Sequence, residues 1–305
     1  METFDRVQLL STSDYEDRVV TALEVYGDAV FIATDNGRLL RFRVKMQASA
    51  LAHLSFTSVL DGECAVGKEK KSVTKILLFP FVGVICQCKD GYLVALDWET
   101  LHISTVLPAM KNIGICTAQM GSMKPGIAIY CKRKLQFFSY NYALKAFHKF
   151  REIECKSDVS SLIWIGQTVL YLASPSIYHV CMSDPWTCHP LHLNQSSLTV
   201  TPNLALIPFS EWYFFVVSGD SLWKLALHPK KILTPVHLSL SALHATLQSV
   251  NLLAADVYFP HLGLLFPSML VCLPLSGEEP AFYPVERAHA VSHASASLLV
   301  ASEGG

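Results

Sequence analysis

The sequence predicts an all-β fold: a β-propeller with seven blades of four strands, the last of them incomplete. Short turns flanked by alternating apolar runs recur about every 40 to 50 residues, which is the period of propeller blades built from β-hairpins. Hydrophobic residues make up 51% of the chain and charged residues 16%, enough apolar side chain for one large core. The seven turns are centred on Asn36, Asp90, Arg133, Pro175, Gly219, Pro267 and Gly304.

The first repeat shows the pattern most clearly. Three β-rich runs cover residues 19–25, 29–34 and 38–44, and the last two are joined by Asp35-Asn36-Gly37, whose residues tolerate positive φ. The third run alternates apolar residues with arginines, as expected of a strand with one wet face. Residues 61–72, a polar lysine-containing segment, are expected to form an exposed loop before the second repeat.

The later repeats follow the same rhythm with more variation. Residues 238–247 do not alternate cleanly and fit a short helix or an outer strand equally well. The remaining expected strands are 73–79, 83–88, 92–97, 102–107, 126–131, 135–140, 148–154, 162–165, 169–172, 177–180, 204–208, 212–217, 222–227, 252–257, 262–266, 269–273 and 297–302.

The last repeat ends early in the sequence. Residues 297–302 followed by Glu303-Gly304-Gly305 match the pattern of 30–37, but no strand follows the turn. A closed propeller leaves no unpaired edge, so Phe4–Leu10 is expected to complete the last blade, with one strand still missing. Residues 1–305 are therefore predicted to be one propeller domain that lacks its final strand.

Composition excludes several classes of function. The net charge of −1 gives no field that would attract nucleic acid. The first ten residues contain charges and no apolar core of signal-peptide length, which predicts a cytoplasmic protein, and the nine scattered cysteines predict reduced, buried thiols. Residues 159–183 and 257–277 are uncharged, but glycines and prolines divide them into short strands rather than membrane spans.

No motif for catalysis or cofactor binding is found. The glycine-rich phosphate loops and the serine-hydrolase elbow are absent, and no histidines or carboxylates recur in a way that would converge at one mouth of a propeller. Cys181, Cys188, His189 and His192 come nearest to metal-ligand spacing, but no Cys-x-x-Cys pair supports them as zinc ligands, and Pro185 and Pro190 indicate a loop there. The sequence predicts a non-enzymatic protein without metal or cofactor.

Two basic clusters are the only candidate binding residues. They fall on a loop and on a hairpin turn, where such side chains are usually just solvated, but either could dock an acidic partner surface. The six residues are Lys68, Lys70, Lys71, Lys132, Arg133 and Lys134.

The sequence of the repeats resembles that of the citron homology domain, in the version found at the N-terminus of vacuolar-sorting tethering subunits and of the TGF-beta receptor-associated protein. The resemblance rests on residues 30–42, on the basic-turn hairpin 127–138 and on the closing segment 298–305, in the same order as in that family. It spans almost the whole chain through diffuse hydrophobic patterns.

The resemblance implies a propeller without catalytic residues that is followed by an α-helical solenoid, which this sequence lacks. It further implies a subunit of the HOPS or CORVET complexes, peripheral on endosomal, lysosomal or vacuolar membranes, whose partners are a Rab-type small GTPase and other tether subunits. The alternative is the regulatory citron homology domain of a kinase or a Rho exchange factor.

Overall fold

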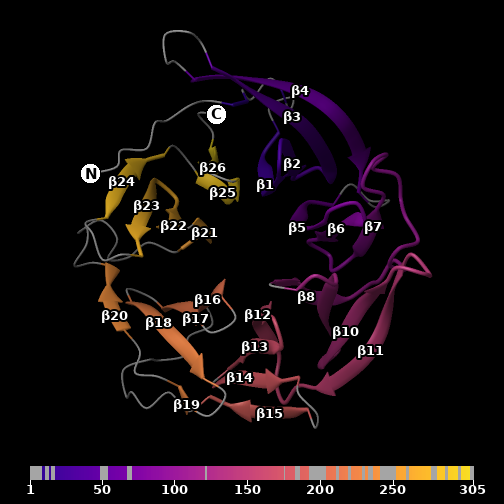
Figure 1. Cartoon of the computed structure of the whole chain (residues 1–305), viewed down its shortest axis with the longest axis vertical. Helices are drawn as coiled ribbons and strands as arrows, with labels where there is room; N and C mark the ends of the chain where they lie inside the picture. The colour runs from indigo at the N-terminus through magenta and orange to yellow at the C-terminus, as the bar shows by residue number, and fades with distance from the viewer. Residues whose placement is uncertain are drawn as a thin grey trace. The chain divides into compact units, whose positions relative to one another are not determined.

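The computed structural model of the chain describes 9–10, 14, 18–48, 54–66, 71–120, 122–174, 176–182, 186–191, 204–210, 213–218, 221–228, 231–232, 236–240, 252–258, 261–275, 280–285, 288–294 and 297–302. The elements with bounds inside these ranges, β1 to β26, are strands (Figure 1). Within these ranges no helix has the length and apolarity needed to cross a bilayer. The strands divide between two compact units, Met1–Ala109 with Asn251–Gly305, and Met110–Val250.

In the described part of unit 1, Met1–Ala109 with Asn251–Gly305, there are four antiparallel sheets in which neighbours in sequence pair. The first strands of adjacent sheets lie next to one another. β1 contacts both β5 and β25, and β25 also contacts β21. The sheets are β1 (Val20–Tyr26), β2 (Ala29–Thr34), β3 (Arg38–Ala48) and β4 (Leu54–Ala65); β5 (Val73–Phe79), β6 (Gly83–Cys88) and β7 (Leu93–Leu96); β21 (Ala254–Tyr258), β22 (His261–Phe266), β23 (Met269–Pro274) and β24 (Ala281–Pro284); and β25 (Ala288–Ala294) with β26 (Ser297–Ser302).

The described residues of unit 2, Met110–Val250, form three such groups of strands. The first two groups are joined edge to edge, because β8 pairs in parallel with β12 and makes one sheet of eight strands. The groups are β8 (Ile113–Met120), β9 (Gly126–Cys131), β10 (Lys134–Asn141) and β11 (Ala146–Glu154); β12 (Val159–Ile165), β13 (Thr168–Ala173), β14 (Ser176–Cys181) and β15 (Thr187–Pro190); and β16 (Ala205–Ser210), β17 (Tyr213–Ser218), β18 (Ser221–His228), β19 (Lys231–Ile232) and β20 (Val236–Ser239).

The cores lie between neighbouring sheets. In unit 1, alternate residues of β2 and β6 pack with Trp98 and Leu101 into one apolar cluster. In unit 2, Phe137 and Trp164 belong to a cluster between the β8–β11 and β12–β15 groups, and a second cluster fills the space between β12–β14 and β16–β18. Both faces of the inner strands are therefore buried, which explains their near-continuous apolar runs.

Most of the expected strands are confirmed, and so is the strand interpretation of the two uncharged stretches. Residues 159–183 contain β12, β13 and β14, and residues 257–277 contain β22, β23 and the end of β21. Leu238 lies on an outer strand, β20, and the rest of 238–247 beyond Leu240 falls outside the described residues. So do Phe4–Gln8 of the proposed closing strand and the turn Glu303-Gly304-Gly305.

Three expectations are wrong. Residues 61–65 are not a loop but the end of β4, because their acidic side chains face arginines of β3 across the ladder. Residues 102–107 form only an isolated bridge from Ile103 to Leu96, since Leu101 adopts a φ of 57° and bends the chain. Cys188 and His189 lie on β15 rather than in a loop. The strands β8, β24 and β25 had not been expected.

Candidate interaction surfaces

The predicted basic turn Lys132-Arg133 forms a two-residue hairpin loop between β9 and β10. Both residues adopt positive φ, 50° and 62°, which is the geometry of a hairpin turn that usually carries Asn-Gly. Both side chains are exposed, and Arg133 Nε lies 4.0 Å from Asp158 Oδ1, an exposed pair worth little in water. The turn therefore presents two cations to solvent, and its role in docking a partner stays a prediction.

The other predicted basic residues differ in their surroundings. Lys134 Nζ lies 2.7 Å from Glu152 Oε1, and Lys149 Nζ lies 3.0 Å from the other oxygen of the same carboxylate. Hydrogen bonds from both lysines, Lys134 first, lower the pKa of Glu152. Lys134 is thus part of a cross-strand charge cluster. Lys71 is exposed ahead of β5, while Lys68 and Lys70 lie outside the described residues.

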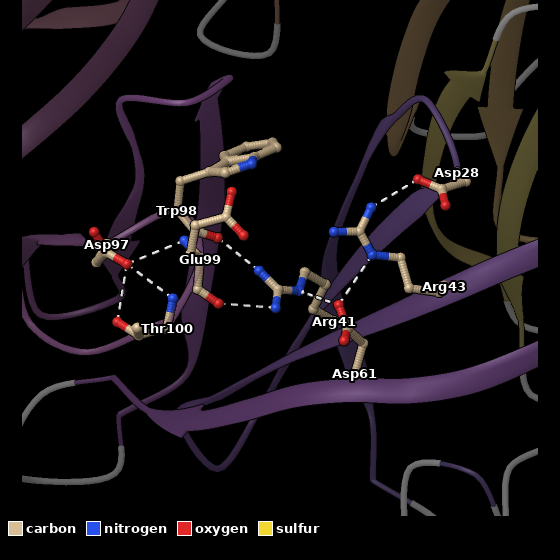
Figure 2. A network of polar contacts seen from close by, with 8 residues as sticks. All are labelled: Asp28, Arg41, Arg43, Asp61, Asp97, Trp98, Glu99 and Thr100. Atoms are coloured by element: carbon tan, nitrogen blue, oxygen red, sulfur yellow. Dashed lines mark hydrogen bonds and ion pairs between the residues drawn. The ribbon is translucent and has the colours of Figure 1, made fainter.

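A buried arginine joins two sheets of unit 1. Figure 2 shows Arg41, from β3, between the segment after β7 and the end of β4. Its NH1 and NH2 groups donate to the carbonyl oxygens of Trp98 at 2.6 Å and Glu99 at 2.9 Å, and its Nε lies 2.9 Å from Asp61 Oδ2. With its side chain only 6% exposed, Arg41 is charge-balanced and fixes the backbone on either side of Trp98.

A second arginine extends this network toward the surface. Arg43 Nε donates to Asp61 at 2.9 Å and its NH1 donates to Asp28 at 2.7 Å, as drawn in Figure 2. The hydrogen bond from Arg43 is the main reason that the pKa of Asp61 is lowered. The network connects the turn after β1 to β3 and β4.

Asp97 shapes the turn that carries Trp98. Its Oδ1 accepts hydrogen bonds from the backbone N–H of Glu99 at 3.0 Å and from the N–H and hydroxyl of Thr100 at 2.8 and 2.9 Å (Figure 2). The bonds from Thr100 are the chief cause of a lowered pKa for Asp97. An Asx turn of this kind explains why β7 stops at Leu96.

Trp98 also supports an exposed aromatic surface. Phe81 is 79% exposed, and its ring centroid lies 6.4 Å from that of Tyr26 and 6.2 Å from that of Trp98. Tyr26 is 44% exposed and packs edge-on against Trp98. Trp98 is buried, and its ring contacts that of Phe31. We call Tyr26 and Phe81, with Trp98 beneath them, the aromatic surface.

Phe81 is held in a conformation that bulky residues avoid. The N–H of Val82 donates to the carbonyl of Phe79 at 2.9 Å, closing a turn with Pro80 and Phe81 at its centre. Phe81 has a φ of 61°, at the turn position where glycine is usual. Strain of this kind costs on the order of 1–3 kcal/mol and is concentrated at functional positions. In the sequence, Phe81 follows Pro80 at a place where the strand pattern breaks, which indicates a turn but does not mark the ring as exposed.

The described residues form no metal site. Of the residues that came nearest to metal-ligand spacing in the sequence, those that are described do not converge on one point. On β15, Cys188 pairs with Val180 and His189 pairs with His179 of β14, so Cys188 and His189 point to opposite faces. His192 lies outside the described residues. All nine cysteines are free thiols, and Cys86 and Cys88 share one face in the core, as expected from their spacing.

Cys188 is expected to be the first cysteine to react with a maleimide. It is the exposed one of the nine, whereas burial raises the pKa of Cys64, Cys88, Cys155 and Cys272 to about 11. A thiol must reach solvent and ionise before it reacts. Mass spectrometry of partially labelled, folded protein measures the order of labelling.

The control is Cys188→Ser, which should remove the fast phase of labelling and leave the slower ones. Equal labelling rates at Cys188 and a fully buried thiol such as Cys86 would contradict the placement of β15.

The comparisons with known proteins concern the fold. No protein-family profile matches the sequence, and no characterised protein matches it in sequence. Among solved structures, the AfRom2 CNH domain matches with a TM-score of 0.60 and 14% identity, over 95% of this chain and 93% of that domain. The Neurospora crassa Pan2 WD40 domain matches with a TM-score of 0.62 and 7% identity, over 95% and 88%.

A third match is PorZ of Porphyromonas gingivalis, an essential surface component of the type-IX secretion system. The TM-score is 0.57 and the identity 12%, over 94% of this chain and 36% of PorZ, so the chain spans about a third of that protein. The matches to CNH and WD40 domains confirm the predicted fold class, a β-propeller, and support the resemblance to a citron homology domain at the level of the fold.

Proposed function

We propose that the chain is a non-enzymatic protein-interaction domain of an endosomal, lysosomal or vacuolar membrane-tethering subunit. Its partners are a Rab-type small GTPase and other subunits of a HOPS- or CORVET-like complex. The class of partner comes from the sequence resemblance to the tethering subunits, and the CNH-like fold supports it. The aromatic surface of Tyr26 and Phe81 is the part of the molecule that we assign to docking the GTPase.

One observation carries this assignment: a large apolar ring is held out into solvent on a rigid support. Phe81 is exposed and has a φ of 61°, and its ring contacts that of buried Trp98. Aromatic anchors dominate the binding energy of many protein interfaces, and a rigid anchor loses little entropy on binding. Beneath Trp98, the guanidinium of Arg41 holds the carbonyl oxygens of Trp98 and Glu99, so the support of the aromatic surface is fixed on both sides of the indole (Figure 2).

Replacing Phe81 by glycine is expected to weaken GTPase binding at least about 10-fold without unfolding the protein, because the ring is lost but the positive φ becomes unstrained. Glycine is a better truncation here than alanine, which would keep the strain. The measurement is the Kd of the whole chain for a panel of Rab proteins loaded with GTP or GDP.

The matched control is Phe150→Ala, which removes a half-exposed aromatic ring of β11 in unit 2 and should leave the Kd unchanged. If the wild-type chain binds no Rab in either nucleotide state, the proposed function is wrong. If it binds one and Phe81→Gly binds equally well, only the assignment to the aromatic surface fails.

The second candidate is the regulatory citron homology domain of a kinase or Rho exchange factor. The observation in its favour is that the matched AfRom2 structure is a CNH domain, covered over 93% of its length. Rho-type GTPases in the same panel separate the two functions, since a regulatory domain of this second kind is expected to bind them in preference to Rab proteins.

A further inference from the structure

The group of strands β8 to β11 ends in two adjacent loops whose apolar side chains face solvent. Residues 122–125 follow β8 and residues 142–145 follow β10, so both loops lie at the same end of an antiparallel meander. Met123 is fully exposed, and Tyr142 and Leu144 are 62% and 64% exposed. We call these two loops the β8–β11 tip.

The tip has a defined shape. Asn141 Oδ1 accepts hydrogen bonds from the N–H groups of Ala143 at 2.9 Å and Leu144 at 3.2 Å, which fixes the second loop. The Tyr142 hydroxyl donates to the carbonyl oxygen of Met123 at 3.5 Å and connects the two loops. The three apolar side chains are therefore presented together.

The charge of this region is one-sided. Between Glu99 and Glu152 the sequence contains no aspartate or glutamate, although the whole chain has a net charge of −1. Two exposed lysines of this interval, Lys124 and Lys145, lie in the tip itself. The cations of the interval are Lys111, Lys124, Lys132, Arg133, Lys134, Lys145, Lys149 and Arg151.

We propose that the β8–β11 tip binds directly to the surface of an anionic phospholipid bilayer. Met123, Tyr142 and Leu144 enter the headgroup region, and Lys124 and Lys145 contact lipid phosphates. Apolar side chains flanked by cations are the combination that binds such interfaces, and tyrosine favours the headgroup level because its ring is apolar and its hydroxyl polar.

The shape of the tip favours lipid over an acidic protein. Its apolar side chains protrude from the ends of two hairpin loops, and a fluid bilayer surface adapts to a protrusion that a protein would have to match with a preformed hollow. A lysine near an anionic membrane surface contributes about fivefold in affinity, so two lysines give a weak contact that salt screens.

The test uses the whole chain and no GTPase. Co-sedimentation is measured with vesicles of phosphatidylcholine alone and of phosphatidylcholine with about one third phosphatidylserine, at low and high salt. The wild-type chain should bind only the phosphatidylserine vesicles, and less at high salt. The variants Lys124→Glu/Lys145→Glu and Met123→Ser/Leu144→Ser should each bind at least about 10-fold more weakly.

The matched control is Lys111→Glu/Lys156→Glu. It makes the same change of charge at exposed positions before β8 and after β11, at the end of the meander opposite the tip, and should keep wild-type binding. The serine variant changes no charge, so it separates apolar insertion from general attraction. Circular dichroism confirms that each variant is folded.

Each of the following results would overturn the proposal. The wild-type chain binds neither vesicle, or it binds both equally. The control loses as much binding as the lysine variant, or the serine variant binds as the wild type does. Capture of an acidic soluble protein through the tip, without vesicle binding, also overturns it. Since the assay contains no GTPase, its outcome is separate from that of the proposed function.

Discussion

Replacing Trp164 by alanine is expected to lower the free energy of unfolding by about 3–5 kcal/mol, the range for truncating a large buried aromatic residue. Trp164 is 2% exposed, and its ring lies edge-on to Phe137 with centroids 5.6 Å apart. Its Nε1 donates to the carbonyl of Gly166 at 3.0 Å, and the truncation removes this hydrogen bond but leaves the one from Gln119 Nε2 to the same oxygen at 2.8 Å. Urea denaturation followed by far-ultraviolet circular dichroism measures the change.

Two further variants make this result specific. Trp164→Phe should keep part of the packing and lose only part of the stability. Trp186→Ala removes a half-buried tryptophan of the same unit, whose ring lies 5.0 Å from the Arg151 guanidinium, and should cost about 1 kcal/mol. A loss for Trp164→Ala as small as that for Trp186→Ala would show that the core between the β8–β11 and β12–β15 groups is misplaced.

Arg41→Met is expected to destabilise the protein by about 2–4 kcal/mol, although methionine is apolar and the site is buried. The carbonyls of Trp98 and Glu99 would lose charged donors at 2.6 and 2.9 Å, and Asp61 would lose one of two arginines. Thermal and urea unfolding of the variant and the wild type measure the difference.

The comparison that isolates burial is Arg43→Met, because Arg43 binds the same carboxylate of Asp61 but its side chain is 35% exposed. Exposed ion pairs are worth at most about 1 kcal/mol, so this variant should remain close to wild type. If the two substitutions cost the same, the carbonyl contacts of Arg41 contribute nothing. Arg41→Met should also reduce GTPase binding through Trp98, which supports Phe81.

The sequence predicts the strands well where the chain alternates or is continuously apolar between turn residues. β2 and β9 follow such runs, and the turns after them contain Gly37 and the basic pair Lys132-Arg133. These signals are local, which is why a single sequence is enough to read them.

What the sequence could not predict depends on partners distant along the chain. Asp61 and Glu63 give the end of β4 the composition of a loop until the arginines of β3 are placed opposite them. β8 contains Gly114, Thr117 and Gln119, so no clear alternation marks it, and its place is fixed by pairing with β9 and β12.

Among the candidate binding residues, too, only those with a local sequence signal could be predicted. The basic turn was found where expected, but the pairing of Lys134 with Glu152 arises only when β10 and β11 meet. Phe81 looks like a core residue in the sequence, because apolar aromatics between strands are usually buried. Its exposure follows from a turn geometry that the identity of its neighbours does not determine.

The parallel pairing of β8 with β12 also has a consequence for synthesis on the ribosome. β8 meets its antiparallel partner β9 almost at once, but Trp164 and Ile165, which pair with Gln119 and Met120, are translated only after β9, β10 and β11. At ~5–20 residues per second this delay is about 2–9 s. During that time one edge of β8 is open to other nascent chains, and only the arrival of β12 closes it.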